Sequence, residues 1–196
     1  MEVRNQNFEI NEAEEKELKA ISLVHKKAYG KSHFTSLFSS NLLSDYYRYF
    51  LTGESKILIY VESDEILGFI VFGKSISKKI KHFKKNNKLL IFFTALKNPL
   101  SSFKILLKKV IKFKISKNKF RESSFILLSV ASMASNKKVG YKLMKAMINE
   151  AIYNKETNIG LYVNMNNFRA LNLYKKLNFK IQNQISNQFY MELNIN

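Results

Sequence analysis

The spacing of apolar residues changes within residues 161–179, from a period of two to a period near four. Leu161 and Val163 alternate with their neighbours, as residues on one face of a strand do. The next apolar positions are separated by three, one and three residues, the spacing of one helix face: Ala170, Leu173, Tyr174 and Leu177. Asn167 stands just before them, where a side chain can cap a helix. The pattern predicts a strand, a short asparagine turn and a helix.

Similar patterns predict helices and strands along most of the chain. Helices are expected at residues 11–28, 41–51, 99–114 and 137–153, and strands at 56–62, 66–73, 124–131 and 188–194. Asn11 followed by Glu14 has the spacing of a capping-box variant, which predicts that the first helix begins there. The last strand is expected to pair with residues 179–183. Strands alternating with helices in the last third of the chain indicate an α/β fold class.

Length and composition fit a single folded domain spanning residues 1–196, since 46% of the residues are apolar and only one is proline. The absence of cysteine excludes disulfide bonds, thiolate metal sites and a cysteine nucleophile. The three histidines lack the spacing of metal ligands, so no metal site is expected. The N-terminus is acidic and polar, unlike a secretory signal, and the apolar run at 89–93 is too short to span a bilayer. The expected location is the cytoplasm.

Positive charge is concentrated in residues 66–121. This segment contains fifteen lysines and Arg121 but no Asp or Glu, so it carries +16 of the overall +18. No Gly-, Ser- or Pro-rich linker bounds it. We therefore expect residues 74–121 to form a basic helical insertion between the third and fourth core strands. Within it, three lysines four residues apart stand opposite an apolar row: Lys104, Lys108 and Lys112 against Phe103, Leu107, Val110 and Phe113.

This basic element is compatible with several partners. Lysines opposite an apolar row suit a helix lying on an anionic membrane surface, which would hold the protein peripherally at the inner membrane. An acidic acceptor molecule, such as a nucleotide-linked sugar, fits the same charge, and so does a simple solvated face. The scarcity of arginine argues against nucleic acid as the partner.

Residues 161–179 resemble the last core segment of the GNAT superfamily of acyl-CoA-dependent N-acyltransferases, which tends to read L-x-V-x-x-x-N-x-x-A-x-x-L-Y-x-K-x-G-F. Eight positions agree: Leu161, Val163, Asn167, Ala170, Leu173, Tyr174, Lys176 and Phe179. Asn178 replaces the glycine, and Asn enters the left-handed conformation more readily than most residues. The resemblance implies a GNAT-like mixed central sheet flanked by helices. It also implies acetyl-CoA as co-substrate.

The resemblance further implies that a strand, a loop and a helix start bind the cofactor. The corresponding residues here are Val130, Ala131, Ser135, Asn136, Lys137, Lys138, Val139, Gly140 and Tyr141. Of the family's loop pattern, [Q/R]-x-x-G-x-[G/A], only Gly140 is retained, because Ser135 replaces the first residue and Lys138 replaces a glycine. Either Lys137 and Lys138 substitute charge for backbone donors, or the site is damaged. Two lysines at a helix start are destabilising unless an anion is nearby, which favours the first interpretation.

By the same resemblance, Tyr174 would donate a proton to the thiolate leaving group, and Asn167 would face the pantetheine arm or that tyrosine. Residues 129–131 would offer backbone N–H groups to the acyl oxygen. The general base is not identified, although His33, His25, Asp45 and Glu62 lie on segments that usually face the acceptor. His33, in a loop, is the preferred catalytic candidate among them.

Each of these residues also has a purely structural interpretation. Tyr174 could be a core residue, Asn167 only a helix cap, and Gly140 a site of close packing. Two functions follow. One is an N-acetyltransferase acting on a primary amine of a small or glycan-linked acceptor. The other is a catalytically degenerate GNAT-like module that binds an anionic membrane or polyanion through its basic helices.

Overall fold

The computed structural model describes residues 8–30, 33–99, 122–133 and 138–195. Seven strands form one sheet in the order β1-β2-β3-β4-β5-β7-β6. They are β1 (Phe8–Glu12), β2 (Ser55–Glu62), β3 (Glu65–Gly73), β4 (Phe125–Ser132), β5 (Asn158–Asn164), β6 (Lys180–Ile185) and β7 (Gln188–Asn194). Neighbouring strands are antiparallel except β4 and β5, which are parallel. The predicted mixed sheet and the pairing of the last two strands are confirmed.

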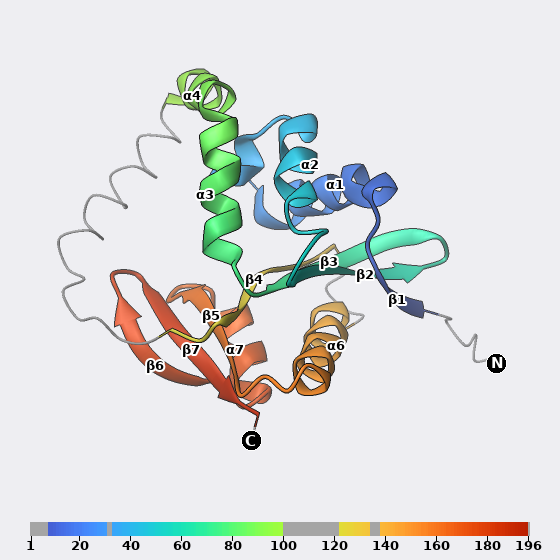
Figure 1. Ribbon diagram of the computed structural model, residues 1–196, viewed down its shortest axis with the longest axis vertical. Coiled ribbons are helices and arrows are strands. Elements are labelled where there is room, and N and C mark those ends of the chain that lie inside the picture. Colours follow the sequence, from blue (N-terminus) through green and yellow to red (C-terminus); the bar gives the residue numbers. More distant parts are fainter. Residues whose placement is uncertain (1–7, 31–32, 100–121, 134–137, 196) are drawn as a thin grey trace.

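Helices cover both faces of this sheet (Figure 1). On one face lie α1 (Leu18–Tyr29), α2 (Ser40–Arg48), α3 (Ile76–Asn86) and α4 (Lys88–Lys97), with the short 3-10 helices η1 (Glu15–Glu17) and η3 (Phe34–Leu37). On the other face lie α6 (Val139–Tyr153) and α7 (Phe168–Lys176). Each face has its own hydrophobic core. Because side chains alternate along a strand, Ile57 and Ile59 of β2 pack in the core under α1 and α2, whereas Leu58 and Tyr60 pack in the core under α6 and α7.

The N-terminal segment differs from the prediction. Asn11 does not begin a helix: it lies in β1, opposite Ile59 of β2. The capping box is formed instead by Glu14 and Glu17, with the Glu14 N–H donating to the Glu17 carboxylate at 2.6 Å. The edge strand takes residues 8–12 because pairing with β2 satisfies their backbone groups, and that overrides a local cap signal.

Two helices lie in the described part of the predicted basic insertion between β3 and β4, residues 74–99. Within these residues, α3 and α4 follow each other directly, and α4 lies at the upper end of α3 in Figure 1. The helix predicted at 99–114, including Lys104, Lys108 and Lys112, lies almost entirely outside the described residues. The helical character of residues 76–97 agrees with the prediction.

The segment that carried the resemblance folds as its spacing predicted. Residues 158–164 form β5 and residues 168–176 form α7. Asn167 caps α7, with its side-chain oxygen accepting a hydrogen bond from the Ala170 N–H at 3.2 Å. Asn178 follows the helix with φ 65°, the left-handed conformation expected of a residue in the glycine position.

Candidate active site

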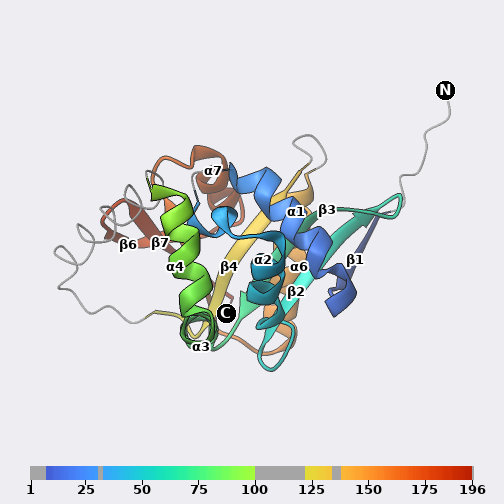
Figure 2. The ribbon, with the colours of Figure 1, turned by 90° about the horizontal axis from the view of Figure 1, so that it is seen from above.

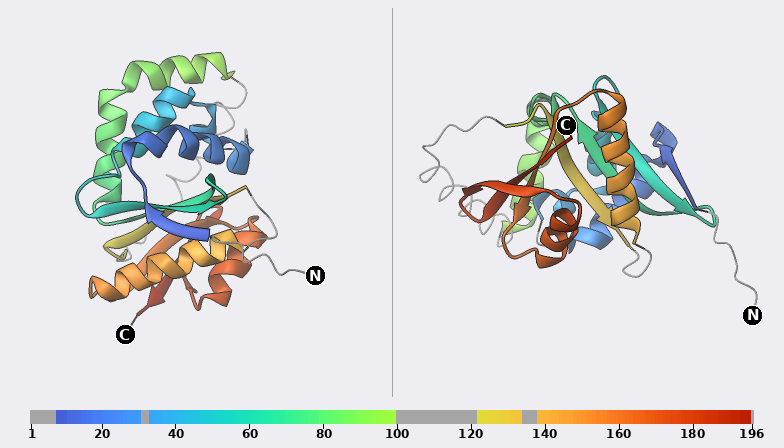
Figure 3. Two further views of the ribbon diagram at one scale, coloured as in Figure 1. Left: turned by 90° about the vertical axis from the view of Figure 1, so that its right-hand side faces the viewer. Right: turned by 90° about the horizontal axis from the view of Figure 1, so that it is seen from below.

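The parallel strands β4 and β5 separate after a short ladder. Their pairing runs from Phe125 opposite Ile159 to Leu127 opposite Leu161, although β4 continues to Ser132 and β5 continues to Asn164. Their carboxyl ends lead into α6 and α7, which lie on the same face of the sheet (Figure 3). The ends of parallel strands at such an edge are the usual place for a ligand in α/β folds.

Tyr29, at the end of α1, bonds directly to β4 beyond the point of separation. Its hydroxyl donates to the main-chain carbonyl of Val130 at 3.0 Å and lies 2.8 Å from the Ser129 hydroxyl. A phenol has only one proton to donate. Because the Tyr29 hydroxyl donates its proton to the carbonyl, the Ser129 hydroxyl must be the donor in its hydrogen bond with Tyr29. Burial raises the pKa of the Tyr29 phenol, which keeps it protonated. The helix therefore fixes the part of β4 that has left its parallel partner.

A chain of side chains leads from Tyr29 toward the surface. His25, one turn earlier on α1, lies with its ring centroid 4.6 Å from that of Tyr29. Its Nδ1 lies 2.5 Å from the Tyr47 hydroxyl, and its Nε2 lies 2.9 Å from the Thr35 hydroxyl. The exposed His33 places Nδ1 2.7 Å from the same Thr35 oxygen and its ring 5.2 Å from that of Tyr29.

The buried histidine is held neutral. Burial, together with the neighbouring His33 and Lys26, lowers the pKa of His25 to about 3. Both ring nitrogens are already engaged, and only 2% of the residue is exposed. These properties give His25 a structural role between α1 and η3, whereas the neighbouring His33 is exposed.

Tyr174 projects from α7 into the core on the α6 and α7 face of the sheet. Its ring is buried and contacts Phe179 at a centroid distance of 6.0 Å. Burial, and secondarily the nearby Tyr29, raises its phenolic pKa above the ordinary value. No described residue hydrogen-bonds its hydroxyl, and Ser36 holds the only fully enclosed unpaired side-chain oxygen of the described chain. Among the described residues, the Tyr174 hydroxyl therefore has no hydrogen-bond partner and is not fully enclosed.

The start of α6 retains the backbone shape of a glycine-containing loop. Lys138 precedes the helix with φ 52°, in the left-handed region that favours glycine, and its side chain does not cap the helix. Gly140 has room for a side chain, since an added Cβ would lie 3.6 Å from the nearest atom, on Leu173. Close packing thus does not explain Gly140. Packing does explain Gly68, where an added Cβ would lie 2.6 Å from Val139 Cγ1.

The remaining predicted binding residues are divided between core and surface. Val139 is buried, Tyr141 packs half-buried on the same core, and Ala131 is buried on the α1 face. Only their backbone groups or the edge of Tyr141 could meet a ligand. Asn167 is exposed with its oxygen engaged as the cap. The loop residues Ser135, Asn136 and Lys137 lie outside the described residues.

The structure places His33 and Val130 in contact with Tyr29, and it places Tyr174 close enough to Tyr29 for the two phenols to interact electrostatically. The other two candidate bases lie apart from this region. Asp45 forms an ion pair with Arg48 on the exposed side of α2, and Glu62 lies on β2, which is separated from β4 by β3. Tyr29 was not singled out from the sequence. Its position four residues after His25, on the same helix face, is the signal that could have found it.

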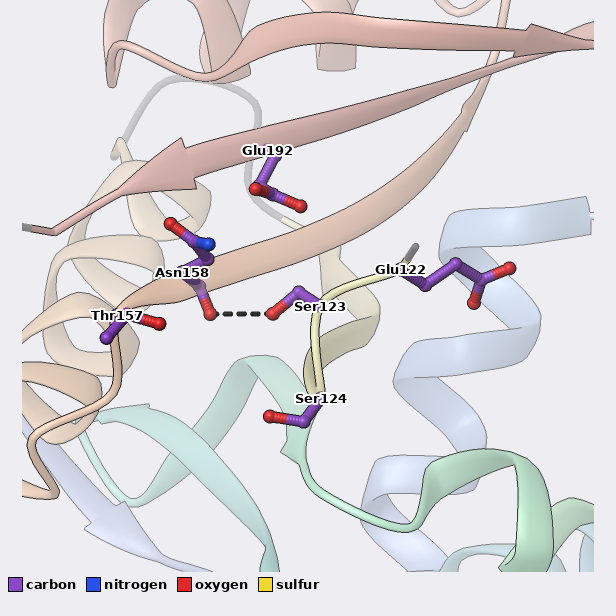
Figure 4. A pocket seen from close by; sticks show the side chains of 6 residues that line it. All are labelled: Glu122, Ser123, Ser124, Thr157, Asn158 and Glu192. Atoms are coloured by element: carbon purple, nitrogen blue, oxygen red, sulfur yellow. Dashed lines mark hydrogen bonds between the residues drawn. The ribbon is translucent and has the colours of Figure 1, made fainter. Parts of the chain in front are cut away.

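A polar hollow of about 440 Å³ lies at the opposite end of β4 and β5 (Figure 4). It is lined by Glu122, Ser123, Ser124, Thr157, Asn158 and Glu192. The Ser123 hydroxyl donates to the Asn158 carbonyl at 2.7 Å, which ties the two strand starts together. Both carboxylates accept hydrogen bonds from tyrosines, Glu122 from Tyr162 and Glu192 from Tyr190. These contacts stabilise the beginning of the sheet.

No family model matches the sequence, and no curated protein matches it. Solved structures match the fold. An N-acetyltransferase from Staphylococcus aureus Mu50 is similar with a TM-score of 0.63 at 15% identity, over 97% of this chain and 99% of that one. A second similar structure is yncA from Salmonella typhimurium, with its cofactor acetyl-CoA. Its TM-score is 0.62 at 14% identity, over 96% of this chain and 94% of that one.

A third similar structure is the PaiA N-acetyltransferase from Thermoplasma acidophilum in complex with coenzyme A. Its TM-score is 0.58 at 15% identity, over 96% of this chain and 99% of that one. Identities this low establish the architecture alone. The mixed seven-stranded sheet, the separated β4 and β5, and these superpositions together give the chain the fold of the GNAT superfamily.

Proposed function

We propose that this protein is an N-acetyltransferase that transfers the acetyl group of acetyl-CoA to a primary amine of a small or glycan-linked acceptor. The observation that carries the proposal is the separation of β4 and β5 beyond Leu127 and Leu161, with the start of α6 at the open edge. Uncapped N–H groups at a helix start suit phosphates, and a gap between strands suits an extended thioester arm. Sharing a fold with N-acetyltransferases supports the same reaction class.

The residues at the start of α6 fit a bound coenzyme. A left-handed conformation costs an ordinary residue about 1–2 kcal/mol, yet Lys138 adopts it and so keeps the loop shape while adding a cation. The open space above Gly140 lets a ligand approach the backbone closely. We therefore favour the interpretation in which lysine charge replaces backbone donors to the phosphates, with Lys138 and the neighbouring Lys137 as binding residues.

Acetyl-CoA would supply the acetyl group as a thioester. Tyr174 is the proposed proton donor to the departing sulfur, because a phenol carries its proton at neutral pH and this hydroxyl has no partner among the described residues. Backbone N–H groups of residues 129–131 are proposed to stabilise the acyl oxygen, on the part of β4 that Tyr29 holds. The acceptor nitrogen forms the new C–N bond as the C–S bond breaks, and it loses one proton.

His33 is the proposed base for that proton. It is exposed, so an acceptor can approach it, and its Nδ1 is oriented by the Thr35 hydroxyl at 2.7 Å. His25 does not suit the role because it is buried and neutral. Asn167 has its side-chain oxygen on the helix cap, so its proposed part is limited to facing the pantetheine arm.

The acceptor is proposed to carry negative charge, such as a nucleotide-linked sugar amine. Residues 74–99 contain eight lysines and no acidic residue, which favours anionic molecules near this side of the fold. A catalytically degenerate module that uses these helices to bind an anionic surface is the alternative. The two differ in one property, since only the enzyme consumes acetyl-CoA.

The test is an acceptor screen that follows the release of the coenzyme A thiol. We expect amines on acidic carriers to release thiol above the background hydrolysis rate, and neutral analogues of the same amines to react more slowly. The His33→Gln variant should retain acetyl-CoA binding and lose turnover. If no amine accelerates thiol release while acetyl-CoA binds, the degenerate module is correct.

A further inference from the structure

Helix α4 carries its large apolar side chains on the outside. Five of them are each more than half exposed: Leu89, Leu90, Phe92, Phe93 and Leu96. No residue of the helix is buried. At about 100° per residue these five positions fall on one arc of roughly 160°, while Ile91, Thr94 and Ala95 point the other way. Ile91 packs against the core beneath. The more apolar face of α4 therefore points toward solvent, the opposite of the usual arrangement in a surface helix.

The helix lies at an extremity of the fold. In Figure 1 it sits at the top, at the end of α3 that is farthest from β5, β6 and β7. Seen from above in Figure 2, it runs across the surface beside α2. A side view in Figure 3 shows it along the upper margin of the molecule. A flat surface could therefore reach α4 without meeting the sheet.

Lysines lie at both ends of this apolar face. Lys88 begins α4 and Lys97 ends it, and Lys84 and Lys85 occupy the last turn of α3 next to it. All four are exposed. No Asp or Glu occurs between residues 74 and 99 to neutralise them. This arrangement suits an anionic bilayer, because the apolar side chains can enter the acyl chains while the lysines contact the anionic headgroups.

We propose that α4 lies in the plane of an anionic membrane surface, inserting Phe92 and Phe93 among the acyl chains while lysines contact the headgroups. With ten residues α4 is too short to cross a bilayer, and no helix of the described chain is long and apolar enough to do so. A second copy of the chain is disfavoured as occupant, because two surfaces rich in lysine repel each other. Acetyl transfer is not required for this contact.

Sedimentation of the full-length protein with vesicles, without acetyl-CoA, measures the contact. We expect binding to vesicles of phosphatidylcholine with about 30% phosphatidylserine, and little binding to pure phosphatidylcholine, because each lysine near an anionic surface strengthens binding roughly five-fold. Lys84→Gln with Lys85→Gln should weaken binding at least ten-fold. The exposed pair Lys19 and Lys27 of α1, changed in the same way, is the control and should have a smaller effect.

Insertion is tested separately from charge. Phe92→Ser with Phe93→Ser should weaken vesicle binding about ten-fold or more. Ile152→Ser with Tyr153→Ser should not, although this pair at the end of α6 is at least as exposed overall. The chain has no tryptophan, so a single Phe93→Trp change provides a probe. Its emission should shift to the blue with anionic vesicles, and that of Tyr153→Trp should stay unchanged.

Three results would overturn the proposal. Equal loss of binding in the α4 and α6 pairs would remove the role of α4. An unshifted emission spectrum of the vesicle-bound Phe93→Trp protein would show that the charge acts without insertion. A doubled mass in solution that the Phe92→Ser, Phe93→Ser protein loses, without vesicle binding by the natural chain, would identify a second copy as the occupant.

Discussion

The Tyr29 hydroxyl donates to the Val130 carbonyl across 3.0 Å, joining the end of α1 to β4 after β4 has separated from β5. Loss of this bond should loosen the strand on which the acyl group is proposed to rest. We expect Tyr29→Phe to lower the free energy of unfolding by about 1–3 kcal/mol, because a partly buried carbonyl loses its donor.

Urea unfolding measures this change. Tyr49→Phe is the matched control, since the Tyr49 hydroxyl accepts its hydrogen bond from Asn86 at the exposed surface. The control should change stability by less than about 0.5 kcal/mol. Similar values for the two variants would show that Tyr29 does not hold β4.

Removal of the Tyr174 hydroxyl should separate chemistry from binding. We expect Tyr174→Phe to bind acetyl-CoA as before and to lose roughly 10²–10⁴-fold in turnover, the usual contribution of a positioned general acid. Its fold should be preserved, since no described residue hydrogen-bonds this hydroxyl. Tyr153→Phe, on the surface of α6, should leave turnover unchanged. Full activity in the Tyr174→Phe protein would contradict the proposed catalytic role and would show that Tyr174 is purely structural.

Two lysines with left-handed backbones allow the loop to be tested against an internal control. Lys138 begins α6 with φ 52°, and Lys155 follows the same helix with φ 56°. Glycine at either position should raise the free energy of unfolding by up to about 1 kcal/mol, because glycine adopts positive φ without strain. Only Lys138→Gly should also weaken acetyl-CoA binding, by at least about ten-fold, since a charged hydrogen bond to phosphate would be lost.

Calorimetric titration with acetyl-CoA gives both affinities. If Lys138→Gly binds as tightly as the Lys155→Gly protein, the cation at position 138 does not contact the phosphates. The damaged-site interpretation of the loop would then be favoured.

Acid should destabilise the protein through His25. The folded pKa is lowered to about 3, while in the unfolded chain this histidine takes up a proton near pH 6.5. The unfolded state therefore binds more protons below pH 6.5, so stability is complete above that pH and falls toward pH 3. Between pH 6.5 and pH 5 the loss is about 2 kcal/mol.

Urea midpoints across this pH range test the assignment. His25→Gln should flatten the decline, because the amide does not titrate. His82→Gln, on the exposed side of α3, should decline as the natural protein does. A slope unchanged by His25→Gln would place the acid sensitivity elsewhere.

The sequence was most informative where local spacing determines structure. The strand and helix of residues 158–176, the Asn167 cap and the left-handed Asn178 all follow from neighbours within a few residues. At Asn11 the same reasoning failed, because a cap signal cannot reveal that a distant strand, β2, offers backbone partners.

The site was less predictable because its contacts join distant segments. Tyr29 and Val130 are 101 residues apart, and nothing local to either indicates the bond. The exposed apolar face of α4 was also hidden, since a run of apolar residues gives no sign of whether it faces core or solvent. Burial is a property of the assembled fold.

Acetyl-CoA binding is the central claim, and thermal unfolding with and without it is the most direct test. At a concentration 100-fold above the dissociation constant, binding stabilises the folded state by about 2.7 kcal/mol. For a chain of this size that corresponds to a rise in Tm of roughly 5–10 °C. We predict such a rise at about 1 mM acetyl-CoA, reduced in the Lys138→Gly protein. No change in Tm at that concentration would contradict the assignment of this GNAT fold to an acetyltransferase.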